Sequence, residues 1–187
     1  KQLKYVERNA KRLLHLINQL MDYRRAELGV FKLRIAQANV HGIVAENFAY
    51  YENLAHTKKI KYTLHSEVEG ERLLVDEQYL ELIINNLLSN AFKYSYEGGT
   101  VEIVLTHDAE SVKIEVRDTG VGLDKDNMKR LFDRFYQGGN SRRMHIDGTG
   151  IGLHLCKMIV DMHKGTIEAA NRADGQRGSV FTVTLHR

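Results

Sequence analysis

The chain has 187 residues, enough for one domain or for one domain with an appendage. Hydrophobic residues make up 43% and charged residues 27%, a balance typical of a soluble globular protein. The single cysteine excludes an internal disulfide and a Cys-rich zinc site, and fits a reducing compartment. No apolar run approaches the roughly 18 residues of a membrane span. The chain shows no signal-peptide pattern and begins without Met, so we expect a fragment of a longer protein.

Residues 1–28 are predicted to form one long helix with a heptad seam. The seam residues recur at alternating intervals of three and four: Leu3, Val6, Ala10, Leu13, Ile17 and Leu20. This helix must bury its apolar face on its own domain or in an intermolecular bundle, and the strict period favours the bundle. The segment is basic, with seven Lys/Arg against three Asp/Glu, whereas the remainder has 20 against 21. Only this helix could therefore support an alternative role in DNA binding.

Beyond the first helix the hydrophobic period changes repeatedly. Apolar and charged residues alternate over residues 31–35, which predicts a half-buried strand. Helical spacing follows over 40–54, and a short strand is predicted around 62–64. Asp76 can cap a further helix, which we expect to run to about Tyr94.

The second half of the chain is predicted to contain most of the strands. Alternation over 101–105 and 112–116 predicts a β-hairpin. A helix is expected from about residue 151 to 164, followed by strands at 167–169 and 180–185. The resulting fold class is α+β, a two-layer sandwich with a mixed, mostly antiparallel sheet, preceded by one long helix.

Residues 124–147 are polar, contain glycine and show no periodicity. A connection of this length inside a compact domain is usually a lid or disordered. The expected organisation is therefore a helical segment at 1–28 and a domain at 29–187, with a lid at about 124–147.

The first cluster of candidate functional residues is a polar stripe on the helix that ends near Tyr94. It comprises Asn86, Asn90, Lys93 and Tyr94, which share one helix face. The apolar residues on a different arc can face the core: Leu82, Ile83, Leu87 and Leu88. Asn disfavours helix interiors, so two on one face indicate more than a solvated surface. An Asn oxygen suits Mg²⁺, and a Lys one turn away can meet a phosphate.

The second cluster is Asp118-Thr-Gly120-Val-Gly122-Leu123, directly after a predicted strand. The glycines permit tight turns and close backbone approach. A carboxylate facing a pocket can accept a hydrogen bond from an exocyclic amine such as that of adenine. Asp-Thr-Gly is also the triplet of aspartic proteases, which leaves a dimeric protease built on Asp118 as an alternative.

The third cluster is a glycine-rich turn just before a predicted helix. It comprises Gly148, Thr149, Gly150, Ile151, Gly152 and Leu153. Such turns present backbone N–H groups to phosphates at a helix N-terminus. The spacing matches neither the dinucleotide-binding fingerprint nor a Walker A loop.

In this order, the three clusters resemble the ATP-binding fold shared by sensor histidine kinases, DNA gyrase and the Hsp90 chaperones. Residues 86–94 resemble the N box, 118–123 the G1 box and 148–153 the G2 box. Residues 131–136 resemble the F box that opens the ATP lid, and this indicates the histidine-kinase branch. The resemblance extends from about Leu33 to the last residue.

The sequence of residues 1–28 is similar to the second helix of the dimerisation and phosphoacceptor hairpin, especially in hybrid two-component sensors. The first hairpin helix, with its phosphoacceptor His in a Thr-Pro context, cannot be present because the chain has no proline. We therefore do not expect this fragment to phosphorylate itself.

The resemblance implies a role for each matched position. Asn90 would ligate Mg²⁺, Tyr94 would lie near the base or ribose, and Asp118 would bind the adenine amino group. The base pocket would be shaped by Gly120, Gly122 and Leu123, and the lid anchored by Phe132 and Phe135. The phosphates would meet Gly148, Thr149, Gly150, Ile151, Gly152 and Leu153. The residues assigned to phosphoryl transfer are Asn86, Lys93, Arg142 and Arg143.

Position 86 distinguishes a kinase from an ATPase within this resemblance. The gyrase and chaperone relatives have a Glu there that activates water, whereas Asn86 cannot act as a base. We therefore expect slow hydrolysis and transfer of the γ-phosphoryl group to a histidine, with a stand-alone ATPase or serine kinase as the alternative. The implied cofactors are ATP and Mg²⁺.

The resemblance also implies partners and a location. We expect a phosphoacceptor hairpin, a response-regulator receiver domain and a homodimer of the full-length protein. The fragment is expected to contact neither nucleic acid nor a membrane, and to be the cytoplasmic domain of a membrane-anchored sensor.

Overall fold

A computed structural model describes residues 21, 24, 32–138 and 149–187, apart from the side chains of residues 125–127. The strands are β1 (Ala36–Asn39), β2 (Lys61–Ser66), β3 (Arg72–Val75), β4 (Thr100–His107), β5 (Ser111–Asp118), β6 (Thr166–Asn171) and β7 (Ser179–His186). The main sheet has the order β2-β4-β5-β7-β6, and β1 pairs with β3 in a small second sheet. Only β2 and β4 are parallel among the described pairs.

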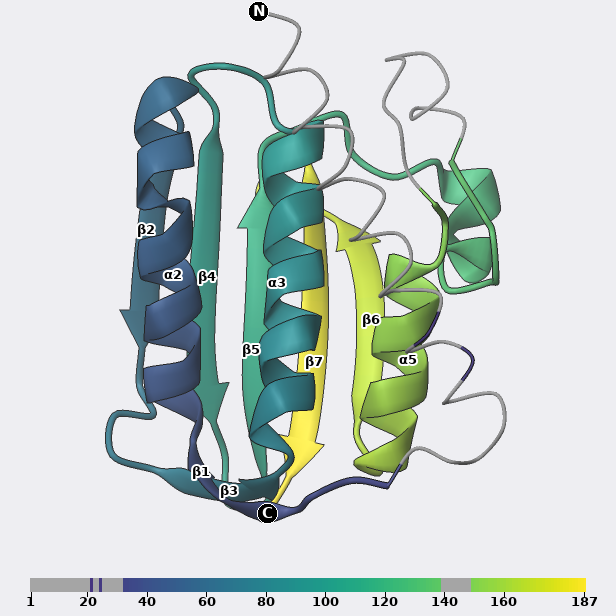
Figure 1. Ribbon diagram of the computed structural model, residues 1–187. Coiled ribbons are helices and arrows are strands. Elements are labelled where there is room, and N and C mark those ends of the chain that lie inside the picture. Colours follow the sequence, from purple (N-terminus) through teal and green to yellow (C-terminus); the bar gives the residue numbers. More distant parts are fainter. Residues whose placement is uncertain (1–20, 22–23, 25–31, 139–148) are drawn as a thin grey trace, which may run out of the picture.

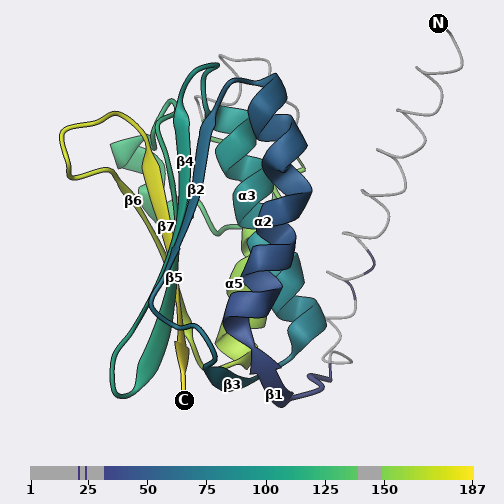
Figure 2. The same cartoon turned by 90° about the vertical axis from the view of Figure 1, so that its left-hand side faces the viewer.

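Helices cover one face of the main sheet (Figure 1). They are α2 (Val40–Thr57), α3 (Glu77–Tyr94) and α5 (Gly152–Met162). A short 3-10 helix, η1, spans Lys125–Arg130. In side view, all three α-helices lie on the same side of the strands (Figure 2). The predicted α+β sandwich with a mixed, mostly antiparallel sheet is confirmed. None of the described helices is both long and apolar enough to cross a membrane.

Side-chain caps fix where the two longest helices begin. Asn39 accepts a hydrogen bond from the Gly42 main-chain N at 3.0 Å and starts α2. Asp76 accepts one from the Tyr79 main-chain N at 3.3 Å and starts α3, as the sequence predicts. Each cap satisfies a helix N–H that has no partner within the helix and contributes about 1 kcal/mol. The Asp76 cap therefore sets where α3, which carries the polar stripe, begins.

The core lies between the helices and the β4–β5 hairpin. The inward residues of the hairpin are at most 1% exposed: Val101, Ile103, Leu105, Val112, Ile114 and Val116. On the helix side, Leu87 and Leu88 of α3 are completely buried. Complete burial of each such side chain contributes roughly 1.5–3 kcal/mol. The packing fixes the end of β5, where Asp118 pairs with Val101 of β4.

The structure corrects the sequence prediction at the start of the domain. The strand expected at Phe31, Leu33 and Ile35 lies later, at β1, and Ile35 is 46% exposed. Pairing with β3 selects the strand, and β3 itself was not predicted because its four residues are too few to show a period. Phe31 and nearly all of the predicted helix at 1–28 lie outside the described residues. Met21 and Arg24, the two described residues there, are helical.

A second difference concerns the end of α5. The helix expected to run to about residue 164 ends at Met162, and Lys164 takes the left-handed conformation, with φ of 56°. Gly165 is needed because a Cβ there would lie 2.3 Å from the Thr184 carbonyl oxygen of β7. The glycine allows the turn after α5 to approach the sheet closely.

Candidate functional site

The polar stripe of α3 is only partly exposed and borders the buried face of that helix. Asn86, Asn90, Lys93 and Tyr94 all have intermediate exposure, whereas Leu87, Leu88, Ala91 and Phe92 are buried. The Asn86 amide Nδ2 donates to the Leu82 carbonyl oxygen at 2.9 Å, which holds this side chain back along the helix. The Lys93 ammonium lies over the Tyr94 ring, 5.3 Å from its centroid. The stripe therefore offers amide oxygens and a cation beside an aromatic ring.

Asp118, at the end of β5, is the buried acid of the site, with 2% exposure. Its Oδ1 accepts a hydrogen bond from the Gly120 main-chain N at 2.7 Å, and its Oδ2 accepts one from the Ser179 hydroxyl. Burial raises the pKa of the Asp118 carboxyl, and the bonds from Ser179 and Gly120 oppose that rise. A carboxylate held in this way has a fixed direction in which it can accept another hydrogen bond.

Two glycines allow the backbone to close around Asp118. A Cβ at Gly120 would lie 2.2 Å from the Tyr94 carbonyl oxygen, and a Cβ at Gly178 would lie 1.9 Å from the Asp118 carbonyl oxygen. Neither position can carry a side chain without moving the backbone. The Val121 main-chain N also donates to the Tyr94 carbonyl oxygen at 3.3 Å. The end of α3 and the loop after β5 therefore meet directly.

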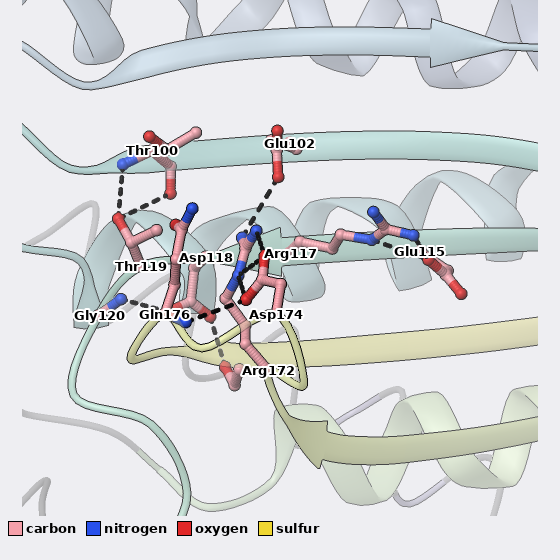
Figure 3. A network of polar contacts seen from close by, with 11 residues as sticks. Thr100, Glu102, Glu115, Arg117, Asp118, Thr119, Gly120, Arg172, Asp174 and Gln176 are labelled. Atoms are coloured by element: carbon pink, nitrogen blue, oxygen red, sulfur yellow. Dashed lines mark hydrogen bonds and ion pairs between the residues drawn. The ribbon is translucent and has the colours of Figure 1, made fainter.

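Polar contacts from three strands surround the end of β5 (Figure 3). The Thr119 hydroxyl accepts a hydrogen bond from the Thr100 main-chain N of β4 at 2.7 Å. Arg172, just after β6, bonds Glu102 of β4 at 3.2 Å and also Asp174. The guanidinium lowers the pKa of Asp174 to about 2, mainly through this hydrogen bond. This network fixes the β6–β7 turn beside Asp118.

The last part of the loop, Gly122 and Leu123, is held by β6. Gly122 has φ of +72°, a left-handed conformation that favours glycine. The side chain of Asn171 then bonds both main-chain groups of Leu123, which itself packs against the core. The two glycines and Leu123 predicted for the base pocket are thus brought together with Asp118.

The F-box residues differ in how they are held. Phe132 packs against the core, and its carbonyl oxygen is bonded by His154 Nδ1 at 2.8 Å. Phe135 is 54% exposed and is held through its backbone, since its main-chain N donates to the Gly150 carbonyl oxygen at 3.0 Å. Gly150 has φ of +68°, and a Cβ there would lie 2.6 Å from the Phe135 carbonyl carbon. Residues 132–135 therefore pack on the glycine-rich turn.

That turn leads into α5 as predicted. The Thr149 hydroxyl accepts a hydrogen bond from the Ile151 main-chain N at 3.3 Å, and Ile151 is buried. Gly152 is the first residue of α5, and Leu153 packs against the core. Three further predicted site residues, Arg142, Arg143 and Gly148, lie outside the described residues.

The sequence analysis missed three residues of the site: Asn171, Arg172 and Ser179. Ser179 had a detectable signal, because it begins the inward stripe that continues as Phe181, Val183 and Leu185. A polar residue at an otherwise apolar position indicates a buried polar partner. Asn171 and Arg172 carried no comparable pattern, since their partners are 48 and 70 residues away.

Chemically, the site joins a buried hydrogen-bond acceptor at one end to a helix N-terminus at the other. The positive end of the α5 dipole favours an anion. Among the described residues, no cluster of His, Cys, Asp or Glu could hold a metal ion. A divalent cation would therefore depend on the Asn oxygens of α3 and on oxygens of the ligand itself.

Comparisons with known proteins agree with this geometry. The chain matches the family model described as histidine kinase-, DNA gyrase B-, and HSP90-like ATPase over residues 75–187. A histidine kinase of Formosa agariphila is 34% identical over 188 aligned positions, which cover 99% of this chain but only 14% of that protein.

Two solved structures share the fold at lower identity. Full-length ShkA in complex with AMPPNP has a TM-score of 0.80 and 24% identity, over 93% of this chain and 35% of that one. ThkA in complex with the response regulator TrrA has a TM-score of 0.75 and 21% identity, over 98% of this chain and 50% of that one. From the family match and the named relatives together, the chain belongs to the histidine kinase-, DNA gyrase B- and HSP90-like ATPase family and carries an ATPase domain of the sensor histidine kinase type.

Proposed function

We propose that this domain binds ATP, with the adenine amino group donating to Asp118 and the phosphates directed to the α5 N-terminus. The observation that carries the proposal is the buried carboxylate of Asp118, oriented by Ser179 and the Gly120 N–H. Desolvating a carboxylate is costly unless it gains hydrogen bonds, and an exocyclic amine supplies a further one. The complex of the similar ShkA with AMPPNP supports this proposal.

The residues present also fit a bound Mg²⁺. Asn90 places a neutral oxygen donor on the partly exposed face of α3, one turn after Asn86. Mg²⁺ keeps most of its ligands as water and phosphate oxygens, so one protein oxygen suffices in a nucleotide site. When bound, the ion would neutralise charge on the phosphates, while Lys93 supplies a second positive charge from the same face.

We further propose that the γ-phosphoryl group passes to a histidine on a separate hairpin and then to an aspartate of a response regulator. Asn86 has no basic group that could activate water, which favours transfer over hydrolysis. The protein's contribution would be positioning and charge stabilisation by Lys93 and the α5 N–H groups, with no covalent intermediate on this domain. The complex of ThkA with a response regulator supports this class of partner.

Several finer points stay predictions. They concern the lid at about 124–147, the phosphate contacts of Arg142 and Arg143, dimerisation of the longer protein, and its anchoring in a membrane. The aspartic-protease alternative gains nothing from the geometry, because it requires two carboxylates that share a proton, whereas Asp118 bonds a serine hydroxyl and a main-chain N–H.

Calorimetric titration with Mg²⁺ and AMPPNP tests the proposal on this chain and on Asp118→Asn. We expect saturable binding that the substitution weakens about 10- to 100-fold, the value of one hydrogen bond to a charged group. Glu110→Gln, in the β4–β5 turn, is the control for the loss of one negative charge. It should bind Mg²⁺ and AMPPNP with the same affinity as the unaltered chain. Equal affinity of the unaltered chain and Asp118→Asn would contradict the assignment of Asp118.

A further inference from the structure

The side chain of Asn171 makes a two-point contact with the main chain of Leu123. We propose that Asn171 is a positioning residue that fixes the Leu123 end of the loop 118–123 and thereby sets how tightly, and for how long, the nucleotide base is held. This inference rests on the proposed nucleotide-binding function.

The contact satisfies both polar main-chain groups of Leu123. Asn171 Oδ1 accepts a hydrogen bond from the Leu123 N at 2.6 Å, and Asn171 Nδ2 donates one to the Leu123 carbonyl oxygen at 3.0 Å. A primary amide carries one acceptor and one donor side by side, so it can replace a neighbouring strand at this point. Leu123 lies five residues beyond the end of β5, where the strand ladder no longer continues.

Asn171 acts from the same rung of the sheet as Ser179. The two residues face each other in the β6–β7 ladder. Ser179 bonds the Asp118 carboxylate at the start of the loop, and Asn171 bonds Leu123 at its end. One residue pair of the β6–β7 ladder therefore fixes both ends of the loop. The loop carries the Asp118 carboxylate at its start and the apolar side chain of Leu123 at its end.

Thr119, near the start of the loop, is bonded to Thr100 of β4, and further hydrogen bonds reach the middle of the loop. Val121 N lies 3.3 Å from the Tyr94 carbonyl oxygen, and the exposed Arg177 reaches the Val121 carbonyl oxygen at 3.2 Å. Immediately before Leu123 stands Gly122, and a glycine has more backbone conformations available than any other residue when its neighbours are not held in place. Without Asn171, ordering of Leu123 would have to accompany ligand binding, which lowers affinity and shortens the lifetime of the complex.

The test compares Asn171→Asp with Asn171→Ala in nucleotide binding across pH. At pH 8 the introduced carboxylate repels the Leu123 carbonyl oxygen and lacks a donor, so we expect Kd for Mg²⁺–AMPPNP to rise about tenfold and dissociation to accelerate. The adjacent carbonyl raises the pKa of the introduced carboxyl above its ordinary value of about 3.9. Its protonated form again has a donor and an acceptor.

The affinity of Asn171→Asp should therefore recover as the pH is lowered towards 5, whereas Asn171→Ala should stay weakened throughout. Each variant is compared with the unaltered chain at the same pH, because Asp118 itself titrates. Asn53→Asp, on the exposed face of α2, introduces the same charge away from the site and should bind normally.

Hydrogen exchange at the Leu123 amide, without nucleotide, separates failure of this inference from failure of the proposed function. We expect protection in the unaltered chain and faster exchange in Asn171→Ala. Unchanged exchange would overturn the inference, as would a lowered Tm with unchanged Kd, which would make the contact merely structural. If the unaltered chain binds no nucleotide, the proposed function fails and the assigned effect on base retention fails with it.

Discussion

The Asp118 end of the site and the end formed by α5 with residues 132–135 are held by different kinds of contact. At the Asp118 end, the acid is 2% exposed and glycines bring backbones within van der Waals contact. At the other end, hydrogen bonds join Phe132 to His154 and Phe135 to Gly150, Gly150 packs closely on the Phe135 backbone, and Phe135 remains 54% exposed. The first arrangement suits recognition of one rigid group, whereas the second leaves an aromatic residue accessible at the surface.

The largest effect expected is at Gly178, where the close packing of the first end can be broken directly. A Cβ in Gly178→Ala would lie 1.9 Å from the Asp118 carbonyl oxygen, and φ of +143° is unfavourable for Ala. We expect a loss of about 3–5 kcal/mol in the free energy of unfolding, measured by urea denaturation. Gly138→Ala is the matched control, since its Cβ would meet nothing within 4 Å. Similar stability of the two variants would show that the close backbone approach at Gly178 is not required for the stability of the fold.

A smaller effect of opposite sign is expected at Asp118. Because burial raises the pKa of this carboxyl, the folded state binds the proton more tightly than the unfolded state. This contribution to stability is complete at low pH and is lost as the pH rises from the unfolded value of 3.8 through the raised value. Asp118→Asn removes that loss. The stability of this variant relative to the unaltered chain should therefore increase across this window, by about 1.4 kcal/mol for each pH unit by which the pKa of Asp118 is raised.

Thermal unfolding of both proteins between pH 4 and 8 measures the difference. A constant difference across this range would mean that the pKa of Asp118 is not raised. The expected result would also sharpen the comparison of the two ends, because it would show that burial of the acid at the Asp118 end opposes stability.

The smallest effect is expected at the second end. His154→Ala removes the hydrogen bond to the Phe132 carbonyl oxygen, which contributes about 1 kcal/mol, and should raise the rate of chymotryptic cleavage at residues 132–135 about fivefold. His65→Ala, on an exposed position of β2, should leave the cleavage rate unchanged. An unchanged rate in His154→Ala would show that packing of Phe132 and the contact between Phe135 and Gly150 hold this segment without the His154 bond.

Local signals predicted the elements that position the site. Asp76 as a cap, the β4–β5 hairpin and the α3 stripe all follow from residues within a few positions of one another. The partners of Ser179 and Asn171 could not be assigned in this way, because they are set only when β7 pairs with β5 and β6 pairs with β7. The start of the domain was misplaced for the same reason, since β1 is defined by its partner β3.

The place of β7 in the sheet has a consequence for the order of folding. It comes last among the described strands in the chain but lies between β5 and β6, and it supplies Ser179, which bonds Asp118 and pairs with Asn171 of β6. During synthesis, β5 and β6 leave the ribosome before the strand that joins them. The site around Asp118 can therefore form only after almost the whole of this domain has emerged, so binding of a ligand there would report completed assembly of the sheet.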